Sequence, residues 1–410
     1  MKVNRRPFVL AVAGTLVLAL TVVGLTAPTV GASTRAKVKT VKICDVSDFS
    51  GVQGAGGPTE FNGGRIAADI VNASGGIKSL GGAKLVVQKF DTQSNPDMGP
   101  PEANAAVAEK CTAIFGGTIS DTVIAESSIT HRAGIPLISL ATADELIKRG
   151  YSNVFLMNTT SGLAQNYYNM MKFVASSLNI AHPTVGVSIN DSTFGVEFYA
   201  AWLALNNASH EFNVVSNVSY PPTTTDFSSI ALSMTSNKPN ILFNAGYPND
   251  AVALQRLFKT TIPTTAQAFL STAVDSLTVS QLGPQAAGQI FGDKSAPPSN
   301  SVALKKFNSL FQSKTGSAPS LSAWVSYSAV MTIALALQKA KSTKGAQISK
   351  ALHQVTLTAA NGNVFPLSVH FANNGVLTNQ PWFWLQDQGG QVQYVYPTAI
   401  KQAPLQPYSG

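Results

Sequence analysis

Strand and helix signals that alternate along most of the chain predict an α/β protein with two successive halves. The clearest unit spans residues 41–91, where a short apolar run, a glycine-rich loop, an amphipathic helix and a second apolar run follow one another. Strand–helix–strand units of this kind build parallel sheets with right-handed crossovers. The chain has 410 residues, which is enough for two domains.

In this first unit, strands are predicted at 41–47 and 84–90, because both are apolar runs of strand length. The helix between them, at 60–72, places apolar and small side chains on one face at spacings of three and four. Gly75 and Gly76 end that helix, since glycine reaches positive φ without a Cβ penalty.

The remaining elements alternate in the same way. In the first half, strands are predicted at 112–117, 135–140 and 154–157, and helices at 102–110, 122–132 and 143–149. In the second half, strands are predicted at 184–189, 214–218, 241–245, 268–271 and 382–386, and helices at 163–178, 196–206, 227–236, 250–259, 301–314 and 323–341. The last helix aligns small and apolar residues at 325, 329, 333 and 336, which indicates a core stripe, and the polar tail from Pro397 is predicted to be loose.

The first 32 residues resemble an export signal. Lys2, Arg5 and Arg6 form a basic region, residues 8–25 are almost wholly apolar, and Ala32 closes a small-residue cleavage site. An uncleaved membrane anchor is the alternative, because the apolar run just reaches membrane-spanning length. The two arginines leave the general secretory and twin-arginine routes both open. Either way, the globular part is predicted to lie outside the cytoplasm.

Composition excludes a nucleic-acid partner. Charged residues make up 12% of the chain, and the net charge of +8 comes from scattered basic residues. Cys44 and Cys111 are the two cysteines of an exported chain, and they fall on strands predicted to be neighbours in a 2-1-3 sheet order. A disulfide between them is predicted, with two buried thiols as the alternative.

Signatures of catalysis and of metal binding are missing from the sequence. It contains no G-x-S-x-G, H-E-x-x-H or G-x-x-x-x-G-K-[ST] motif. Its five histidines are isolated, and the glycines at 54, 56 and 57 lack the third glycine of a dinucleotide fingerprint. No catalytic residue, metal or cofactor is therefore expected.

Two strand-to-helix turns carry hydroxyl groups where ligands of open α/β sheets bind, beyond the carboxyl ends of the strands. Ser120 follows the strand at 112–117, and Thr142 follows the strand at 135–140. Free N–H groups and partial positive charge at a helix amino terminus suit a carboxylate. The alternative is plain helix capping, and Thr142 with Glu145 fits a capping box.

The order S-G…E-F-N-G-G-R…D-I-V-N-A-S-G-G-I-K between residues 50 and 78 resembles the opening of the leucine/isoleucine/valine-binding proteins. These are extracellular subunits of ABC importers with the type I periplasmic-binding-protein fold. The resemblance implies two doubly wound lobes joined by three crossover segments, at 159–162, 294–300 and 371–373. It implies a first lobe of residues 41–159 plus 294–372 and a second lobe of residues 160–293 plus 373–400.

The same resemblance implies the ligand-binding residues. Ser120 and Thr142 match the residues that hold the ligand's α-carboxylate, and Ala141 matches the residue whose carbonyl accepts from the ammonium. Two aromatic residues that cover the ligand match Phe194 and Tyr247. The family's acidic residue for the ammonium falls on Ser271, with Asp275 as a substitute, and a family aromatic falls on Gly56, which would enlarge the pocket. These departures favour an amide, an aromatic acid or a peptide-like ligand.

The resulting hypothesis is an exported, monomeric solute-binding protein that closes two lobes over a small polar ligand and delivers it to a membrane permease of the ABC type. The ligand class is an amino acid, an amide or a related carboxylate. A sensing module of the same fold without transport is the main alternative. A secreted enzyme is the third, and it requires a nucleophile and a base within hydrogen-bond reach in the cleft.

Overall fold

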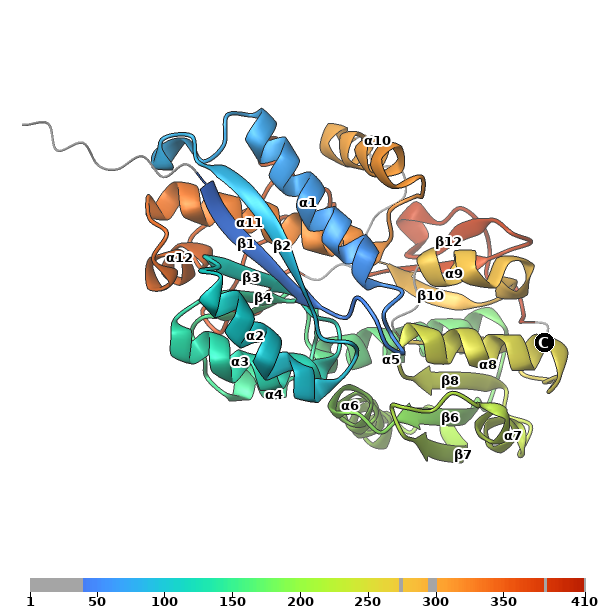
Figure 1. The fold of residues 1–410 in the computed structure, drawn as a ribbon. Helices are drawn as coiled ribbons and strands as arrows, with labels where there is room; N and C mark the ends of the chain where they lie inside the picture. Colours follow the sequence, from blue (N-terminus) through green and yellow to red (C-terminus); the bar gives the residue numbers. More distant parts are fainter. Residues whose placement is uncertain (1–39, 273–275, 294–300, 380–381, 409–410) are drawn as a thin grey trace, which may run out of the picture. The chain divides into compact units, whose positions relative to one another are not determined.

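The computed structural model describes residues 40–272, 276–293, 301–379 and 382–408. Two sheets organise these residues (Figure 1). The first has five parallel strands in the order β2-β1-β3-β4-β5, and the second has seven in the order β12-β11-β10-β9-β8-β6-β7. The predicted α/β class with two lobes and the predicted 2-1-3 order are confirmed.

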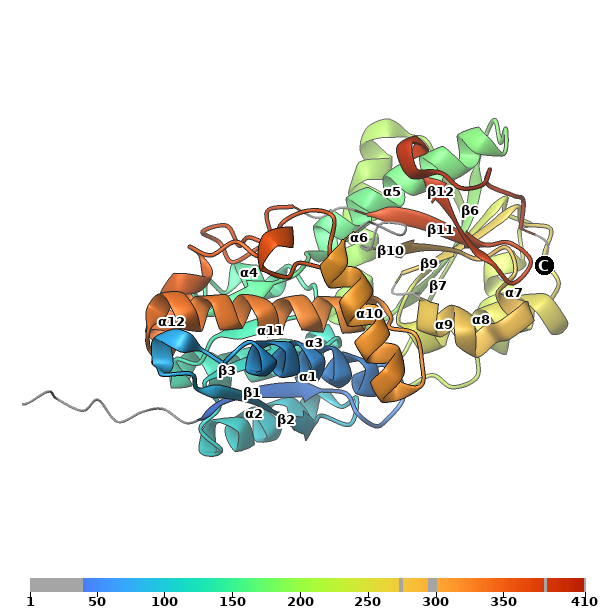
Figure 2. The same ribbon diagram turned by 90° about the horizontal axis from the view of Figure 1, so that it is seen from above.

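The first lobe is built on the unit at 41–91. Its strands are β1 (Thr40–Ser47), β2 (Lys84–Asp91), β3 (Ala113–Gly116), β4 (Leu137–Ser139) and β5 (Val154–Leu156). Its early helices are α1 (Gly57–Ala73), α2 (Gly99–Ala108), α3 (Ser120–Ala133) and α4 (Glu145–Lys148). Three late helices return to this lobe: α10 (Val302–Thr315), α11 (Leu321–Ala340) and α12 (Gly345–Leu352). Figure 2 shows α10 and α11 beside α1.

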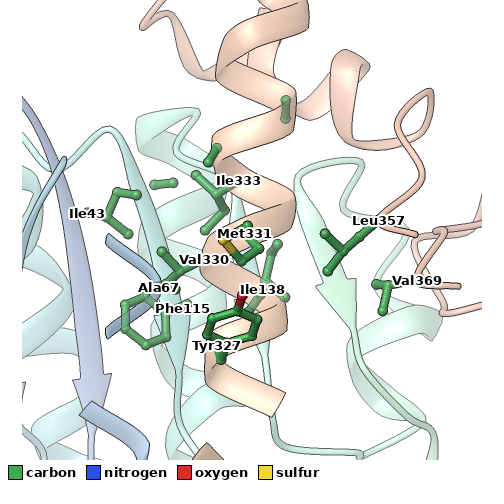
Figure 3. Packing of buried hydrophobic residues seen from close by; sticks show 14 of the residues in the cluster. Ile43, Ala67, Phe115, Ile138, Tyr327, Val330, Met331, Ile333, Leu357 and Val369 are labelled. Atoms are coloured by element: carbon green, nitrogen blue, oxygen red, sulfur yellow. The ribbon is translucent and has the colours of Figure 1, made fainter. Parts of the chain in front are cut away.

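Helix α11 is the centre of the first lobe's core. Its residues Val330 and Ile333 are buried with Ile43 of β1 and Phe115 of β3, as Figure 3 shows. Its length and apolar composition would suit a membrane span, but 72% of that window is buried inside the protein, as in the core helix of a soluble protein. The predicted core stripe on this helix is therefore confirmed, with each of its four residues at most 5% exposed.

The second lobe surrounds the larger sheet. Its strands are β6 (Thr184–Asn190), β7 (Asn213–Tyr220), β8 (Ile241–Ala245), β9 (Ala268–Ser271), β10 (Ile290–Asp293), β11 (Phe383–Asp387) and β12 (Val392–Tyr396). Its helices are α5 (Thr160–Ser177), α6 (Thr193–Ser209), α7 (Ser228–Thr235), α8 (Pro248–Thr260) and α9 (Ser276–Leu282). Strand β11 runs antiparallel to both of its neighbours. The sequence interpretation had no counterpart for α9, β10, α12 and β12.

Two expectations about the end of the chain are wrong. The tail after Pro397 is not loose: Leu405 and Tyr408 are buried, and the Tyr408 hydroxyl donates to Gln255 Oε1 at 3.0 Å. The chain also remains with the first lobe beyond 371–373, because Leu377 N donates to Leu156 O at 3.0 Å. The expected export signal, the crossover at 294–300 and Asp275 lie outside the described residues.

In the structure, Cys44 and Cys111 form a disulfide with their Cα atoms 5.8 Å apart. Cys44 lies within β1, and Cys111 comes two residues before β3. The bond therefore links neighbouring strands in the centre of the first sheet, where both residues are buried.

Candidate functional site

A cavity of about 170 Å³ lies between residues of the two lobes, beyond the carboxyl ends of the strands. The first lobe contributes Gln53, Gly56, Thr118, Thr142 and Asn158, together with Leu321, Ser322 and Val325 from the start of α11. The second lobe contributes Leu163, Phe194, Tyr247, Pro248, Asn249 and Gln281. Trp382 and three further side chains from the first lobe (Ala55, Leu140 and Met157) complete the lining.

The turn between β3 and α3 brings one hydroxyl to the cavity. Gly116 and Gly117 adopt φ values of 107° and 72°, and this left-handed pair reverses the chain directly after the strand. Thr118 then lines the cavity, and its hydroxyl lies 3.4 Å from Asp48 Oδ2. Ser120, the residue predicted from this turn, is only 1% exposed and does not line the cavity. Its Oγ has no hydrogen-bond partner among the described residues.

The turn after β4 places Thr142 on the cavity wall, in agreement with its expected position. Helix α4 begins three residues later with Asp144 as its cap, so the interpretation of Thr142 and Glu145 as a capping box is wrong. The Thr142 hydroxyl instead lies 3.0 Å from the hydroxyl of Thr160 at the start of α5. Ala141 is 1% exposed and lies behind the lining.

Aromatic side chains of the second lobe form an apolar wall. The rings of Phe194 and Tyr247 lie 5.6 Å apart with a tilt of 36°, and both line the cavity together with Trp382. Asp250 Oδ2 accepts from Tyr247 N at 3.0 Å and anchors the start of α8. Burial raises the pKa of Tyr247, so its hydroxyl stays neutral at physiological pH.

Ser271 does not reach the cavity. It is fully buried at the end of β9, and its hydroxyl donates to Asn244 Oδ1 at 2.9 Å. Among the lining residues that the structure describes, none carries a carboxylate, an ammonium or a guanidinium group. The described wall is therefore made of hydroxyls, amides and apolar groups, which recognise a ligand by hydrogen bonds and shape.

Gly56 adds room to this cavity. It lines the wall at the start of α1, and a Cβ atom placed there would meet nothing within 4 Å. The expectation that glycine at this position enlarges the pocket is in line with this open space.

Two carboxylates link the lobes beside the cavity. Glu197 of α6 accepts from the backbone N–H groups of Asp144 at 2.7 Å and Glu145 at 3.2 Å. Asp121 of α3 accepts from the N–H of Thr193, at 3.3 Å for the shorter contact, and from the Thr193 hydroxyl. Each lobe thus supplies a carboxylate to backbone groups at the start of a helix in the other, which favours a closed arrangement.

Several lining residues escaped the sequence interpretation. Asn158 follows β5, Asn249 lies in the first turn of α8 and Gln281 lies near the end of α9, and an amide at such a position has no distinctive spacing. Thr118 could have been found from the sequence, because it directly follows a pair of glycines, Gly116 at the end of β3 and Gly117 after it. Leu321 and Ser322 line the site because the chain, after forming most of the second lobe, returns to the first lobe with α11.

The chain belongs to the periplasmic binding protein family, because the family's sequence model matches residues 40–391, well over half of the chain. Proteins of this family bind solutes outside the cytoplasm. This class agrees with the two lobes and with the cavity between them.

The sequence is similar to two groups of curated relatives. The chain is 27% identical over 379 residues to Leu/Ile/Val-binding protein homolog 7 of Brucella melitensis biotype 1, covering 88% of this chain and 92% of the relative. Over 218 residues it is 31% identical to homolog 8 of Brucella abortus strain 2308, covering 52% of this chain and 53% of that protein.

Among solved structures, the branched-chain amino acid transporter substrate-binding protein of Streptococcus pneumoniae, in complex with isoleucine, matches with a TM-score of 0.74. Its sequence is 22% identical, and the match covers 88% of this chain and all 100% of that one. A substrate-binding protein of Desulfitobacterium hafniense, in complex with Leu, matches with a TM-score of 0.68 at 18% identity, covering 87% and 100% of the two chains. These likenesses establish the fold.

Proposed function

We propose that this protein captures a small polar ligand between its lobes outside the cytoplasm and delivers it to an ABC permease. The observation that carries the proposal is the cavity that both lobes line with hydroxyl, amide and aromatic groups. Closure over such a site excludes water, so a few hydrogen bonds discriminate well. The names of the relatives, and the isoleucine and leucine complexes of the structural neighbours, support a ligand of the amino-acid class or close to it.

The lining favours a ligand with one acceptor-rich end and one apolar end. Thr142 and Asn158 offer donors to a carboxylate or an amide, and the rings of Phe194 and Tyr247 face an aliphatic or aromatic group. A dry cavity of about 150 Å³ holds one benzene molecule, so about 170 Å³ suits a ligand of that order of size. Because the described lining has no carboxylate, an amide or a carboxylate without an ammonium group fits better than a zwitterion.

The rest of the proposal concerns the whole chain. The basic and apolar start of the sequence serves export, with cleavage after Ala32. The protein works as a monomer, contacts a permease rather than nucleic acid, and binds its ligand without chemical conversion. The sequence carries no catalytic motif that would argue for conversion.

The test is calorimetric titration with three compounds that share one carbon skeleton: L-isoleucine, 3-methylpentanoate and 3-methylpentanamide. At least one of the two compounds without an ammonium group is expected to bind as tightly as isoleucine or more tightly. Binding of isoleucine alone would overturn the preference for a ligand without an ammonium group. Failure of all three to bind would overturn the assignment of this cavity to ligands of this size.

Two variants test whether the ligand binds in this cavity. Thr142→Val removes a donor to a charged or polar group, which is worth roughly 1.5–3 kcal/mol to a carboxylate, so affinity should fall about ten- to a hundredfold. Thr223→Val makes the same exchange at an exposed position of the second lobe, away from the cavity, and should leave affinity unchanged. Equal affinities in the two variants would show that the Thr142 hydroxyl has no part in binding.

A further inference from the structure

Four carboxyl groups lie buried together behind the cavity, in the first lobe. They belong to Asp45 of β1, Asp48 just after it, Glu60 of α1 and Glu126 of α3, and none is more than 2% exposed. Each of the four is absent from the ion pairs found among the described residues. Both oxygens of Glu126 and Asp45 Oδ2 have no hydrogen-bond partner there either. Buried charges without partners are costly, so neutral carboxyl groups are favoured.

The contacts around Ser47 favour a proton within this cluster. Ser47 Oγ lies within hydrogen-bond distance of Asp45 Oδ1 and, at 2.6 Å, of Glu60 Oε1. The Ser47 hydroxyl has one hydrogen, so it donates to only one of these two oxygens. The other contact between oxygens is a hydrogen bond only when the carboxyl group carries the hydrogen. The two close contacts around this single hydroxyl therefore favour a proton on Asp45 or Glu60.

The oxygen atoms of Ser47 and Glu60 contact the turn that leads to the cavity. Gly117 N donates to Ser47 Oγ at 2.8 Å and to Glu60 Oε1 at 3.0 Å. A Cβ atom at Gly116 would come within 2.3–2.5 Å of Asp45 Oδ1, Ser47 Oγ and Glu60 Oε1, so the three oxygens converge on this turn. The next residue is Thr118, which lines the cavity. Ser47 and Glu60 thus hold the backbone one residue before that hydroxyl, together with the bonds from Leu140 N to Gly116 O at 3.2 Å and from Ala141 N to Gly117 O at 2.7 Å.

We propose that Glu60 is a positioning residue for ligand binding, and that loss of the proton it shares with Ser47 and Asp45 places like charges around Ser47, displaces the turn at 116–120 by their repulsion and weakens binding at alkaline pH. The inference rests on the proposed function, because the turn matters to binding only if the cavity holds the ligand. Its first part, the buried proton, does not depend on where the ligand binds.

The groups around Glu60 offer no cation to replace the proton. Asp45 and Asp48 face it from β1 and the following loop, and Glu126 faces the cluster from α3. Helix α11 packs on α1, but its one charged residue, Lys339, lies in its last turn. Arg65, the cation of α1 itself, donates to Asn62.

The direction of the pH effect follows from burial. Burial, with the nearby charge of Asp48, raises the pKa of Glu60 from 4.5 to about 8. Burial also raises the pKa of Asp45, Asp48 and Glu126. The folded protein keeps the Glu60 proton up to about pH 8, whereas the unfolded chain releases it near pH 4.5. Stability therefore falls as pH rises through that window, because the folded state binds more protons than the unfolded state.

The test begins on the parent protein without ligand. With ¹³C-labelled glutamate side chains, the Glu60 carboxyl signal is assigned by its absence in Glu60→Gln or, should that variant not fold, in Glu60→Asp. A titration midpoint above neutral pH is expected, together with faster exchange of the Gly117 amide as pH passes that midpoint, beyond the ordinary base-catalysed increase. A midpoint near the ordinary glutamate value would overturn the inference.

Glu60→Gln supplies the second measurement. The neutral side-chain amide in this variant can still accept from Gly117 N and does not titrate. The number of protons released on unfolding, obtained from the pH dependence of stability, should therefore be smaller by about one than in the parent protein. In the parent, affinity for 3-methylpentanamide and for L-isoleucine should drop roughly tenfold between pH 7 and 9, as is usual for a coupling between two sites, and in Glu60→Gln it should stay flat. Glu211→Gln, an exposed acid of the other lobe, is the control and should behave as the parent.

The two proposals fail in different ways. If none of the three compounds binds but the Glu60 signal titrates above neutral pH, the proposed ligand class is wrong and the buried proton remains. If a compound binds with the same pH dependence in the parent and in Glu60→Gln, Glu60 has no part in positioning the turn.

Discussion

The cross-lobe contact of Glu197 offers a test of closure that leaves the cavity wall untouched. Its carboxylate accepts from two backbone N–H groups at the start of α4, and Lys148 lies 3.7 Å away. Glu197→Ala removes this acceptor from the closed arrangement without changing a residue that lines the cavity. We expect weaker ligand binding, because the ligand then closes the lobes with fewer contacts.

The magnitude follows from the contacts. Two hydrogen bonds at a net value of about 0.5–1.5 kcal/mol each contribute roughly 1–3 kcal/mol. Lys148 adds little, because its side chain is 66% exposed. Burial raises the pKa of Glu197, so desolvation of its charge offsets part of the gain. A net loss near 1.4 kcal/mol corresponds to about a tenfold weaker affinity.

Calorimetry and stopped-flow fluorescence measure this effect. Binding should weaken chiefly through faster dissociation, since the lost contacts exist only in the closed form. Glu211→Gln is the control, because Glu211 pairs with Lys172 of its own lobe. An unchanged dissociation rate in Glu197→Ala would refute the view that these carboxylate contacts hold the lobes closed.

Two further predictions concern the first lobe. Replacing Cys44 and Cys111 by alanine should cost about 2–4 kcal/mol of stability by chemical denaturation, since the bond closes a long loop; two titratable thiols in the denatured parent protein would contradict the disulfide. Gly56→Phe should lower ligand affinity by at least about tenfold while Tm stays close to that of the parent, because the position faces open space at an ordinary φ of −77°. Unchanged affinity would place the ligand elsewhere.

The helices and strands that were predicted from the sequence are those whose own residue pattern specifies them. The unit at 41–91 was predicted nearly to its ends, because its strands are continuous apolar runs and glycines stop its helix. Helix α12 and strands β10 and β12 are short, and β12 is only partly buried at the sheet edge. Such elements exist because a neighbour pairs or packs with them, and their own periodicity is too brief to detect.

The site residues also divide into those that the sequence predicted correctly and those that it did not. Thr142, Phe194 and Tyr247 line the cavity and were named from the sequence, whereas Ser120 and Ser271 lie behind it. Ser120 lies two residues beyond Thr118, and the left-handed glycines before them decide which hydroxyl faces the cavity. A serine or threonine after a strand is therefore a sound candidate, but the choice between close neighbours depends on backbone angles.

The sequence by itself determined the α/β class, the strand order around β1, the family and the kind of groups at the ends of the strands. Each of these rests on short-range patterns or on shared spacing. Tertiary structure alone decided that Asp45, Ser47 and Glu60 would meet at the backbone of Gly117, and that the start of α11 would close the cavity. The physical reason is that a buried carboxyl group is recognised by what surrounds it, and its surroundings come from strands and helices distant in the chain.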